Sequence, residues 1–310
     1  MKVVFFGTPE FSVPSLQALI RHGLEVTAVV TRPDRPRGRG LTTIEPPPAA
    51  VEARKHGISI LQPDKTSDPA FLEKVRDAKP DAFAVAAYGH FLPDRLLALA
   101  PRGAWNVHPS LLPRWRGPAP VHRALLAGDS VTGVSIMRIT DRMDAGPVAR
   151  QETTAIGTGE TRGELERRLA ILGADMLASV LAALERDSVI LVAQDEERMT
   201  HAAMLKPGES ELKWPEPPAV LDRLVRALLP APGAFFRHGA ARVKVTGIGP
   251  VGGTAEKEPG TLLERNDAGA WRVACGSGSL WIASVQPEGG KSMTMDAFVS
   301  GRRLSQGSRL

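Results

Sequence analysis

The first ninety residues alternate short apolar runs with amphipathic segments, and this order constrains the fold more than any other feature. The apolar runs at residues 2–6, 25–31 and 81–89 are nearly continuous instead of alternating with polar residues. Strands of this kind are covered by helices on both faces, as in a parallel sheet. Apolar residues at helical spacing lie between them, at 12–23 and 46–57. These strand–helix–strand repeats predict an α/β fold with a doubly wound, mostly parallel, Rossmann-like sheet.

The last third of the chain follows a different pattern. One short helical segment, residues 219–230, is followed by brief apolar runs separated by glycines. Short strands at this spacing predict a smaller C-terminal β-barrel or sandwich. Little periodicity and many turn formers precede it, which indicates a linker. We therefore expect a first domain at residues 1–186, a linker at 187–205 and a second domain at 206–310.

Composition narrows the possible classes of protein. No run reaches the roughly 18 apolar residues that a membrane span needs, and the apolar start is too short for a signal peptide. A single cysteine, Cys275, excludes an internal disulfide and fits a reducing compartment. We expect a cytoplasmic protein without membrane contact, with Cys275 as a small buried hydrophobe.

The positive charge is unevenly distributed along the chain. The formal net charge is +5, and residues 206–310 contain 14 Lys and Arg against 10 Asp and Glu. An excess in the last third favours a phosphate-bearing partner. A solvated surface would have a similar composition, so both interpretations stay open at this point.

Several common sites are absent from the sequence. Gly7 follows the first apolar run, but the other two glycines of the dinucleotide fingerprint G-x-G-x-x-G are missing. The seven histidines include no His-x-x-x-His pair and have no second cysteine to join them, so we expect no metal site. No G-x-S-x-G elbow marks a hydrolase. Ser110 is therefore interpreted as a hydrogen-bonding residue and not as a nucleophile.

A stiff, polar segment, "NVHPSLLPRWRGPAP" at residues 106–120, follows one predicted strand. Asn106 and His108 are two residues apart, so in an extended chain their side chains point to the same side. Asp144 lies in a turn between two further predicted strands and could reach the same crevice. An amide, an imidazole and a carboxylate suit acyl transfer, because the first two can stabilise an oxyanion and the third can orient the imidazole. The residues alone equally allow a strand-end histidine and a turn-forming aspartate.

This segment and several others closely resemble the methionyl-tRNA formyltransferases. The similarity runs nearly from end to end, through "FFGTPEF", "TRPDRPRGRG", "AAYGHFLP", "DRMDAGP", "AQDEERMTHAAMLKPGESELKW" and "VQPEGGKSMTMDAFVSGRR". The combination of Asn-x-His-x-Ser-Leu-Leu-Pro with a later Asp is shared by the wider family that takes a formyl group from 10-formyltetrahydrofolate. "RWRG" and the C-terminal third are similar to the transfer-RNA enzymes in particular.

The resemblance implies a role for each matching position. Asn106 and His108 would polarise the formyl oxygen, and Asp144 would pair with His108 and handle the proton. It implies no metal and 10-formyltetrahydrofolate as co-substrate. The predicted walls of the folate pocket are Tyr88, Gly89, His90, Phe91, Leu92, Ser110, Leu111, Leu112 and Pro113.

The resemblance also implies an RNA partner, the acceptor arm of initiator methionyl-tRNA. Residues 1–186 would form the catalytic domain, and residues 206–310 an oligonucleotide-binding-like barrel that binds the transfer RNA. Arg35, Arg37 and Arg39 would contact the aminoacylated end, with Arg39 the principal contact. After "GRG" the chain reads "LTTIEPPPAA", where lysines are expected in many members. Binding of the transfer RNA by this loop should therefore depend more on these arginines. We expect a monomer.

Other functions share parts of this pattern. A formyltransferase acting on an amino sugar nucleotide or on glycinamide ribonucleotide would have the same three residues, but little use for a basic loop and a basic barrel. A formyl-folate hydrolase would replace the amine by water. A non-catalytic RNA-binding protein on the same scaffold would not need the intact triplet.

Overall fold

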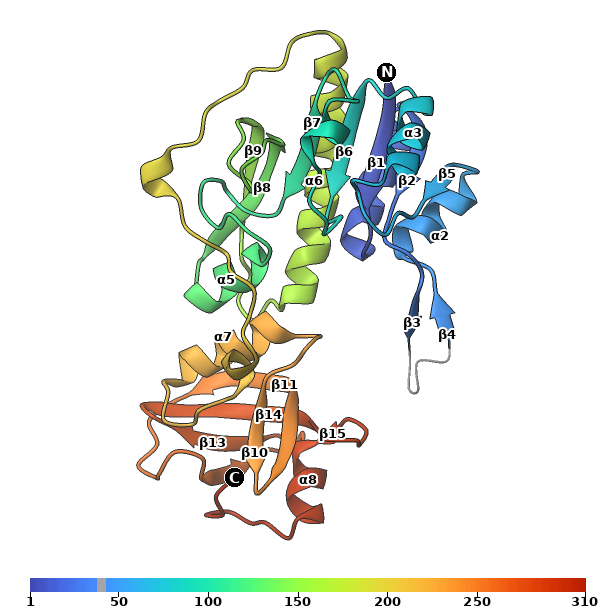
Figure 1. Cartoon of the computed structure of the whole chain (residues 1–310). Helices are drawn as coiled ribbons and strands as arrows, with labels where there is room; N and C mark the ends of the chain where they lie inside the picture. The colour runs from blue at the N-terminus through green and yellow to red at the C-terminus, as the bar shows by residue number, and fades with distance from the viewer. Residues whose placement is uncertain (38–42) are drawn as a thin grey trace. The chain divides into compact units, whose positions relative to one another are not determined.

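The computed structural model describes residues 1–37 and 43–310 (Figure 1). Contacts within the chain divide it into two compact units. The first unit consists of Met1–Gly117, Val131–Ala155 and Glu166–His201, and the second of Pro118–Ser130, Ile156–Leu165 and Ala202–Leu310. The division into domains at 1–186 and 206–310 with a linker between them stays a prediction.

A seven-stranded sheet forms the centre of the first unit, in the order β5-β2-β1-β6-β7-β8-β9. Its strands are β1 (Lys2–Gly7), β2 (Glu25–Val30), β5 (Ser59–Leu61), β6 (Ala82–Ala86), β7 (Ala104–His108), β8 (Val131–Arg138) and β9 (Val148–Ala155). The first five strands in this order are parallel, and β8 and β9 run antiparallel to their neighbours. The predicted α/β, mostly parallel sheet is confirmed. Because the order reverses beside β1, the carboxyl ends of β1 and β6 flank the crevice where such sheets bind ligands.

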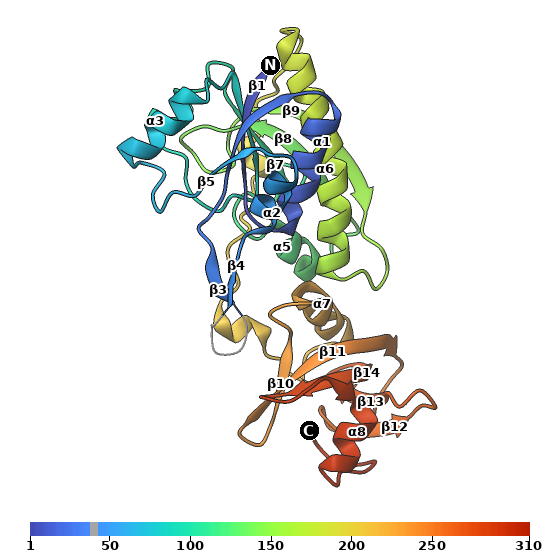
Figure 2. The same cartoon turned by 90° about the vertical axis from the view of Figure 1, so that its right-hand side faces the viewer.

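Helices cover both faces of this sheet. They are α1 (Val13–Arg21), α2 (Pro48–Lys55), α3 (Pro69–Asp77), α4 (Asp94–Leu97) and α6 (Arg162–Glu185). Figure 2 shows α3 on one side of the sheet and α1 and α6 on the other. Residues of β1 and β6 are buried throughout from Val3 and Ala82 onward, which explains their continuous apolar runs.

The close packing of α6 on the sheet depends on Gly173. A Cβ at Gly173 would lie 2.4 Å from Cγ1 of Val107 and 3.1 Å from Cγ1 of Val134. Val107 on β7 therefore points toward α6. Because side chains alternate along a strand, the residues on either side of Val107 point to the opposite face.

A six-stranded antiparallel sheet forms the second unit, in the order β10-β11-β14-β13-β12 with β15 paired to β14. The strands are β10 (Phe235–His238), β11 (Ala241–Gly252), β12 (Leu262–Arg265), β13 (Trp271–Cys275), β14 (Gly278–Pro287) and β15 (Met293–Thr294). No ladder joins the two end strands, β10 and β12, in the described part of the chain. The smaller C-terminal β domain that the sequence predicts is present.

The core of the second unit brings this sheet together with helices α7 (Pro218–Leu228) and α8 (Met295–Gly301). Helix α5 (Pro120–Ala127) also belongs to this unit. Cys275 is buried, as predicted, and burial raises the pKa of its thiol to about 11. Its thiol is therefore un-ionised at neutral pH and a poor nucleophile.

Some elements were not predicted from the sequence. Strand β10 is too short for a clear sequence pattern, although its "FF" dipeptide is apolar. Helix α8 is also short, and Thr294 caps it by accepting a hydrogen bond from the Ala297 amide. The basic loop that the resemblance implies contains Arg35, Arg37 and Arg39. Its first part forms a β-hairpin, in which β3 (Arg35–Arg37) pairs with β4 (Thr43–Glu45). Both views show this hairpin extending from the sheet beyond the end of β2 (Figures 1 and 2).

No helix within residues 1–37 and 43–310 is long and apolar enough to cross a membrane.

Replacing Gly173 by leucine should destabilise the first unit. The added side chain cannot enter the contact with Val107 without moving α6, and such overpacking costs about 1–3 kcal/mol or more. We expect a loss of about 2 kcal/mol in the free energy of unfolding by urea, followed by tryptophan fluorescence. Ile171→Ala on the exposed face of the same helix is the control and should change it by less than about 0.5 kcal/mol. Equal stability of the two variants would contradict the assigned packing.

Candidate active site

Asn106 and His108 lie on β7, on the face of the sheet opposite to α6. Their placement follows from the contact of Val107 with Gly173, since Val107 lies between them and points the other way. His108 is the last residue of β7, at the carboxyl edge of the parallel strands, and its side chain is almost completely buried. The same-side arrangement expected from their spacing is therefore present.

The ring of His108 lies between a carbonyl and a carboxylate. Nε2 is 2.9 Å from the backbone oxygen of Trp115, and Nδ1 is 3.6 Å from Oδ2 of Asp144. A carbonyl oxygen only accepts, so Nε2 carries the proton in this contact. The Nδ1 distance is longer than a hydrogen bond. The Nδ1 edge can thus receive a further acceptor beside Asp144.

Asp144 occupies a tight turn between β8 and β9. Its φ of 50° lies in the left-handed region, which non-glycine residues rarely adopt outside turns and functional sites. Its Oδ2 accepts a hydrogen bond of 2.9 Å from the amide of Gly117. Two residues on, Gly146 is in such close contact that a Cβ there would lie 1.8 Å from the Arg138 oxygen. The structure thus brings Asp144 to His108, as the sequence suggested.

The side-chain amide of Asn106 has no hydrogen-bond partner among the residues that the structure describes. It lies on the central part of the sheet, opposite Met137 of β8 and Val85 of β6. An amide without an internal partner is available to a ligand. It can donate to an oxygen that lies on the same face as His108.

The segment after β7 is held by two polar residues that sequence reasoning missed. Ser135 on β8 donates to the Ser110 oxygen at 2.6 Å and accepts from the Leu112 amide at 3.1 Å. Gln151 on β9 donates to the Leu112 oxygen at 2.7 Å and to Ser135 Oγ at 2.9 Å. The predicted folate residues Ser110 and Leu112 are buried, and Leu112 packs on Met137 and Val148. No local pattern distinguishes Ser135 and Gln151 from ordinary strand residues.

The segment predicted to be a linker also contacts this part of the chain. Arg116 is buried, and its guanidinium makes two hydrogen bonds to Glu196, of 3.0 and 3.1 Å. These bonds to Arg116, together with the nearby Arg142, lower the pKa of the exposed Glu196 carboxyl. Thr200 accepts from the Trp115 amide at 2.9 Å, and its own amide donates to the Pro113 oxygen at 3.3 Å. Residues 194–200 are therefore part of the first unit's structure.

The second predicted wall of the folate pocket follows β6, next to the crevice at the reversal of strand order. Tyr88 and Leu92 are buried in the core, and Phe91 is exposed. Burial raises the pKa of Tyr88 to about 12, whereas burial and the charges of Arg32 and Arg35 lower the pKa of His90.

The backbone of this loop offers several hydrogen-bond donors. Among the described residues, no acceptor faces the amide groups of Gly89, His90, Phe91 and Leu92. Three of its oxygens already accept hydrogen bonds, because Thr8 donates to the Tyr88 oxygen, Arg32 to the Gly89 oxygen and Thr66 to the Phe91 oxygen. Free donors beside apolar side chains fit the acceptor-rich edge of a pteridine, so the residues present are compatible with a folate.

The predicted RNA-contacting arginines lie only partly in the described structure. Arg35 is exposed at the start of the β3–β4 hairpin, and the backbone of Arg37 ends β3. Arg39 lies outside the described residues. Residues 1–37 and 43–310 contain no group of three or more His, Cys, Asp and Glu side chains that could hold a metal.

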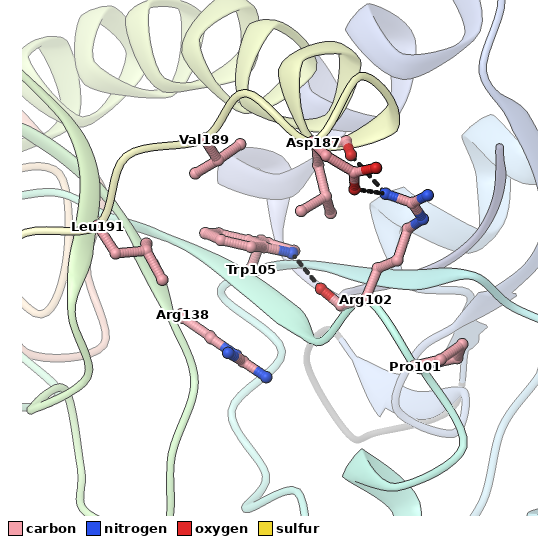
Figure 3. A pocket seen from close by; sticks show the side chains of 8 residues that line it. Pro101, Arg102, Trp105, Arg138, Asp187, Val189 and Leu191 are labelled. Atoms are coloured by element: carbon pink, nitrogen blue, oxygen red, sulfur yellow. Dashed lines mark hydrogen bonds and ion pairs between the residues drawn. The ribbon is translucent and has the colours of Figure 1, made fainter.

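A hollow of about 420 Å³ lies elsewhere on the first unit, around the beginning of β7 (Figure 3). Trp105 lies in it and donates to the Arg102 oxygen at 3.1 Å. The Arg102 guanidinium already bonds the Leu184 oxygen and Asp187. None of the predicted site residues lines this hollow, so the candidate active site is the one around His108.

Comparison with known families agrees with this site. Residues 1–181 match the family model described as "Formyl transferase". Residues 204–303 match the model described as "Formyl transferase, C-terminal domain". Both parts of the chain thus have the sequence features of formyl transferases.

Curated relatives define the family more narrowly. A methionyl-tRNA formyltransferase of Geotalea daltonii is 40% identical over 100% of this chain and 98% of its own length. Those of a Methylobacterium species and of Halorhodospira halophila are 43% and 41% identical over 99–100% of this chain and 98–99% of their own. The chain belongs to the methionyl-tRNA formyltransferase family, and the resemblance seen in its motifs is confirmed.

Solved structures show the same fold at lower identity. A HypX variant from Aquifex aeolicus has a TM-score of 0.69 and 16% identity, and the chain spans about half of its length (49%). HypX has also been solved with tetrahydrofolic acid (TM-score 0.65, 17% identity, covering 97% of this chain and 47% of that one). The sugar 3N-formyl transferase WlaRD has a TM-score of 0.66 and 13% identity, covering 93% of this chain and 97% of its own.

Replacing Gly146 by alanine should displace Asp144. The new methyl group would collide with the Arg138 oxygen, and the backbone of the turn must move to relieve this contact. A shift of about 1 Å at a catalytic group can lower the rate about 100-fold. We expect a fall in kcat of that order in a formyl-transfer assay.

The matched control is Gly157→Ala, where the added methyl meets only ordinary contacts of 3.5 Å or more. It should keep the activity of the unmodified protein. Full activity of Gly146→Ala would show that the close approach of Arg138 does not fix the position of Asp144.

Proposed function

We propose that the protein transfers a formyl group from 10-formyltetrahydrofolate to the α-amino group of methionine on initiator methionyl-tRNA. The observation that carries this proposal is the grouping of His108 and Asp144, with Asn106 on the same face, in a member of this family. The relatives' name supplies the formyl group and its acceptor. The folate form of the donor is our inference from the motifs and from the free amides after β6.

In this proposal the protein supplies no nucleophile. A free α-amino group has a pKa of about 7.7–8.0, and esterification of the neighbouring carboxyl to the transfer RNA lowers it, so much of the amine is uncharged near neutral pH. The transfer forms a C–N bond to the amine, breaks the C–N bond to the folate, and moves one proton from the amine to the folate nitrogen. The residues of the site need only align the two reactants, stabilise charge on the formyl oxygen and carry that proton.

Each residue of the triplet then has one task. The free amide of Asn106 and Nδ1–H of His108 donate to the formyl oxygen as negative charge develops there. Nε2–H of His108 stays bonded to the Trp115 oxygen, which fixes the plane of the ring. The carboxylate of Asp144 lies 3.6 Å from Nδ1, where it orients the ring and can accept the amine proton.

We assign the folate to the loops after β6 and β7, at Tyr88–Leu92 and Ser110–Pro113. Co-substrate binding there brings the formyl group to the carboxyl edge of the sheet, next to His108. Arg35, Arg37 and Arg39 then contact the aminoacylated end of the transfer RNA. We further infer a monomer in the cytoplasm, with a catalytic domain at 1–186 and an RNA-binding domain at 206–310.

The exposed cations of β11 are the part of the second unit that we assign to RNA phosphates. Along β11, Val243 and Val245 are buried while Arg242 and Lys244 are exposed. Neither cation has an ion-pair partner in the part of the chain that the structure describes. Exposed cations without acidic partners retain their full attraction for phosphate.

One assay separates the proposed function from its alternatives. The protein is incubated with 10-formyltetrahydrofolate and with either charged initiator transfer RNA, an amino sugar nucleotide, glycinamide ribonucleotide or no acceptor. We expect tetrahydrofolate to form only with the transfer RNA. Release without an acceptor would indicate a hydrolase, and release with another amine would indicate a different formyltransferase. No release in any tube would favour a non-catalytic RNA-binding protein.

Substitutions in the triplet should lower turnover without unfolding the protein. Asn106→Ala or His108→Ala should reduce kcat roughly 10²–10³-fold, the usual loss for one oxyanion donor. Asp144→Asn should be at least as damaging, because the amide cannot accept the proton. Folate affinity, measured by calorimetry, should change little. A residue whose replacement leaves kcat near normal has no part in the mechanism.

Removing the exposed cations of β11 should weaken RNA binding. Each lost phosphate contact should lower the slope of log affinity against log salt by about 0.7–0.9, so Arg242→Ala/Lys244→Ala should lower it by up to about 1.8. Filter binding at several salt concentrations measures this slope. The control, Arg265→Ala/Arg309→Ala, removes two cations that are paired with Asp296 and Glu258. If both double variants have the unmodified slope, this face does not bind the RNA.

A further inference from the structure

Gln194 lies in the predicted linker, yet its side chain is bonded to the turn that carries Asp144. Its Nε2 donates to the backbone oxygens of Asp144 at 2.8 Å and of Gly146 at 2.7 Å. Its Oε1 accepts from Nε of Arg116 at 2.8 Å. All three contacts are within normal hydrogen-bond length. One side chain therefore joins the Asp144 turn to the segment that follows β7.

The other end of this connection is firmly fixed. Arg116 is 4% exposed and holds Glu196 through two hydrogen bonds, and its amide donates to the Thr200 oxygen at 2.9 Å. The next residue, Gly117, donates its amide to the Asp144 carboxylate. The carboxylate and the backbone of Asp144 are thus both attached to residues 116 and 117, one directly and one through Gln194.

The chemistry of this position is specific to an amide. Both donors of the Gln194 NH₂ face carbonyl oxygens, and its oxygen faces a guanidinium donor. A carboxylate of the same shape could keep the contact with Arg116 but would place an acceptor against two acceptors. The turn around Asp144 has an unfavourable left-handed backbone, so it needs such external bonds to persist.

We propose that Gln194 is a positioning residue for the reaction, which holds Asp144 within reach of His108 without touching either substrate. The inference rests on the proposed function, since it concerns the geometry of the same site. It also gives the segment between the two predicted domains a task in catalysis besides connecting them.

Gln194→Glu tests the inference, because it keeps the size and the bond to Arg116 and loses both donations. We expect kcat to fall about 10–100-fold through misplacement of Asp144, while KM for the folate and for the transfer RNA stays within about twofold. Glu197→Gln is the matched control, since its exposed side chain makes none of these contacts. It should behave as the unmodified protein. Unchanged kcat in Gln194→Glu would overturn the inference.

A double substitution distinguishes positioning from a general structural defect. If Gln194 acts through Asp144, adding Gln194→Glu to Asp144→Asn should lower kcat by less than about twofold more. A defect that spreads through the unit would instead multiply the two losses, and this result would overturn the inference.

A second measurement needs no catalysis. The Gly117 amide reports directly on Asp144, so its NMR resonance should shift and its hydrogen exchange should quicken in Gln194→Glu but not in Glu197→Gln. An unaltered Gly117 amide would overturn the inference whatever the activity. If the unmodified protein is inactive with charged transfer RNA while Gly117 responds as expected, the proposed function fails and the connection from Gln194 to Asp144 stands.

Discussion

Residues 109–117 leave β7 and pass through a partly buried region without forming a helix or joining the seven-stranded sheet. Backbone amides and carbonyls that are buried away from water need partners, and this segment supplies only some of them, such as the Ser110 hydroxyl that donates to the Arg114 oxygen. Other partners come from outside it: Ser135 and Gln151 from the sheet, Thr200 from the later segment, and the carboxylate of Asp144. The same hydrogen bonds also hold the Trp115 oxygen against His108. The fixed position of the His108 ring therefore results from the hydrogen bonds that this backbone requires.

The site separates fixed groups from free ones. His108 has its Nε2 side bound and its Nδ1 side facing a carboxylate at more than hydrogen-bond distance. The Asn106 amide and the loop after β6 have donors without acceptors among the described residues. Groups that are held in place before a ligand arrives need no reorganisation during the reaction, which is the main source of electrostatic stabilisation in enzymes. A small number of free donors, on a well-supported frame, is what formyl transfer requires.

The strands of the first unit could be predicted because their signal is local: runs such as residues 2–6 are apolar, and the fold buries both of their faces. The common face of Asn106 and His108 follows from their spacing, and the position of Asp144 near His108 was suggested by its place in a turn; their catalytic roles stay a prediction. The residues that hold the site in place could not be predicted from the sequence. Ser135 and Gln194 are single polar residues in a strand and in an apparent linker, and their partners are 25 and about 50 residues away in the chain. Their importance comes only from long-range contacts, which no local pattern contains.

The placement of Gln194 and Thr200 has a consequence for how the molecule is made. A chain that emerges from the ribosome in order can assemble all seven strands of the sheet and bring His108 near Asp144 before residue 194 has been synthesised. Domains fold as units while the chain grows, but here the last supports of the site come from the segment that follows α6. The nascent sheet would therefore exist for a time with a loosely held site, which becomes rigid only as that segment attaches. The contacts of residues 194–200 are in this way the last of the site's supports to be synthesised.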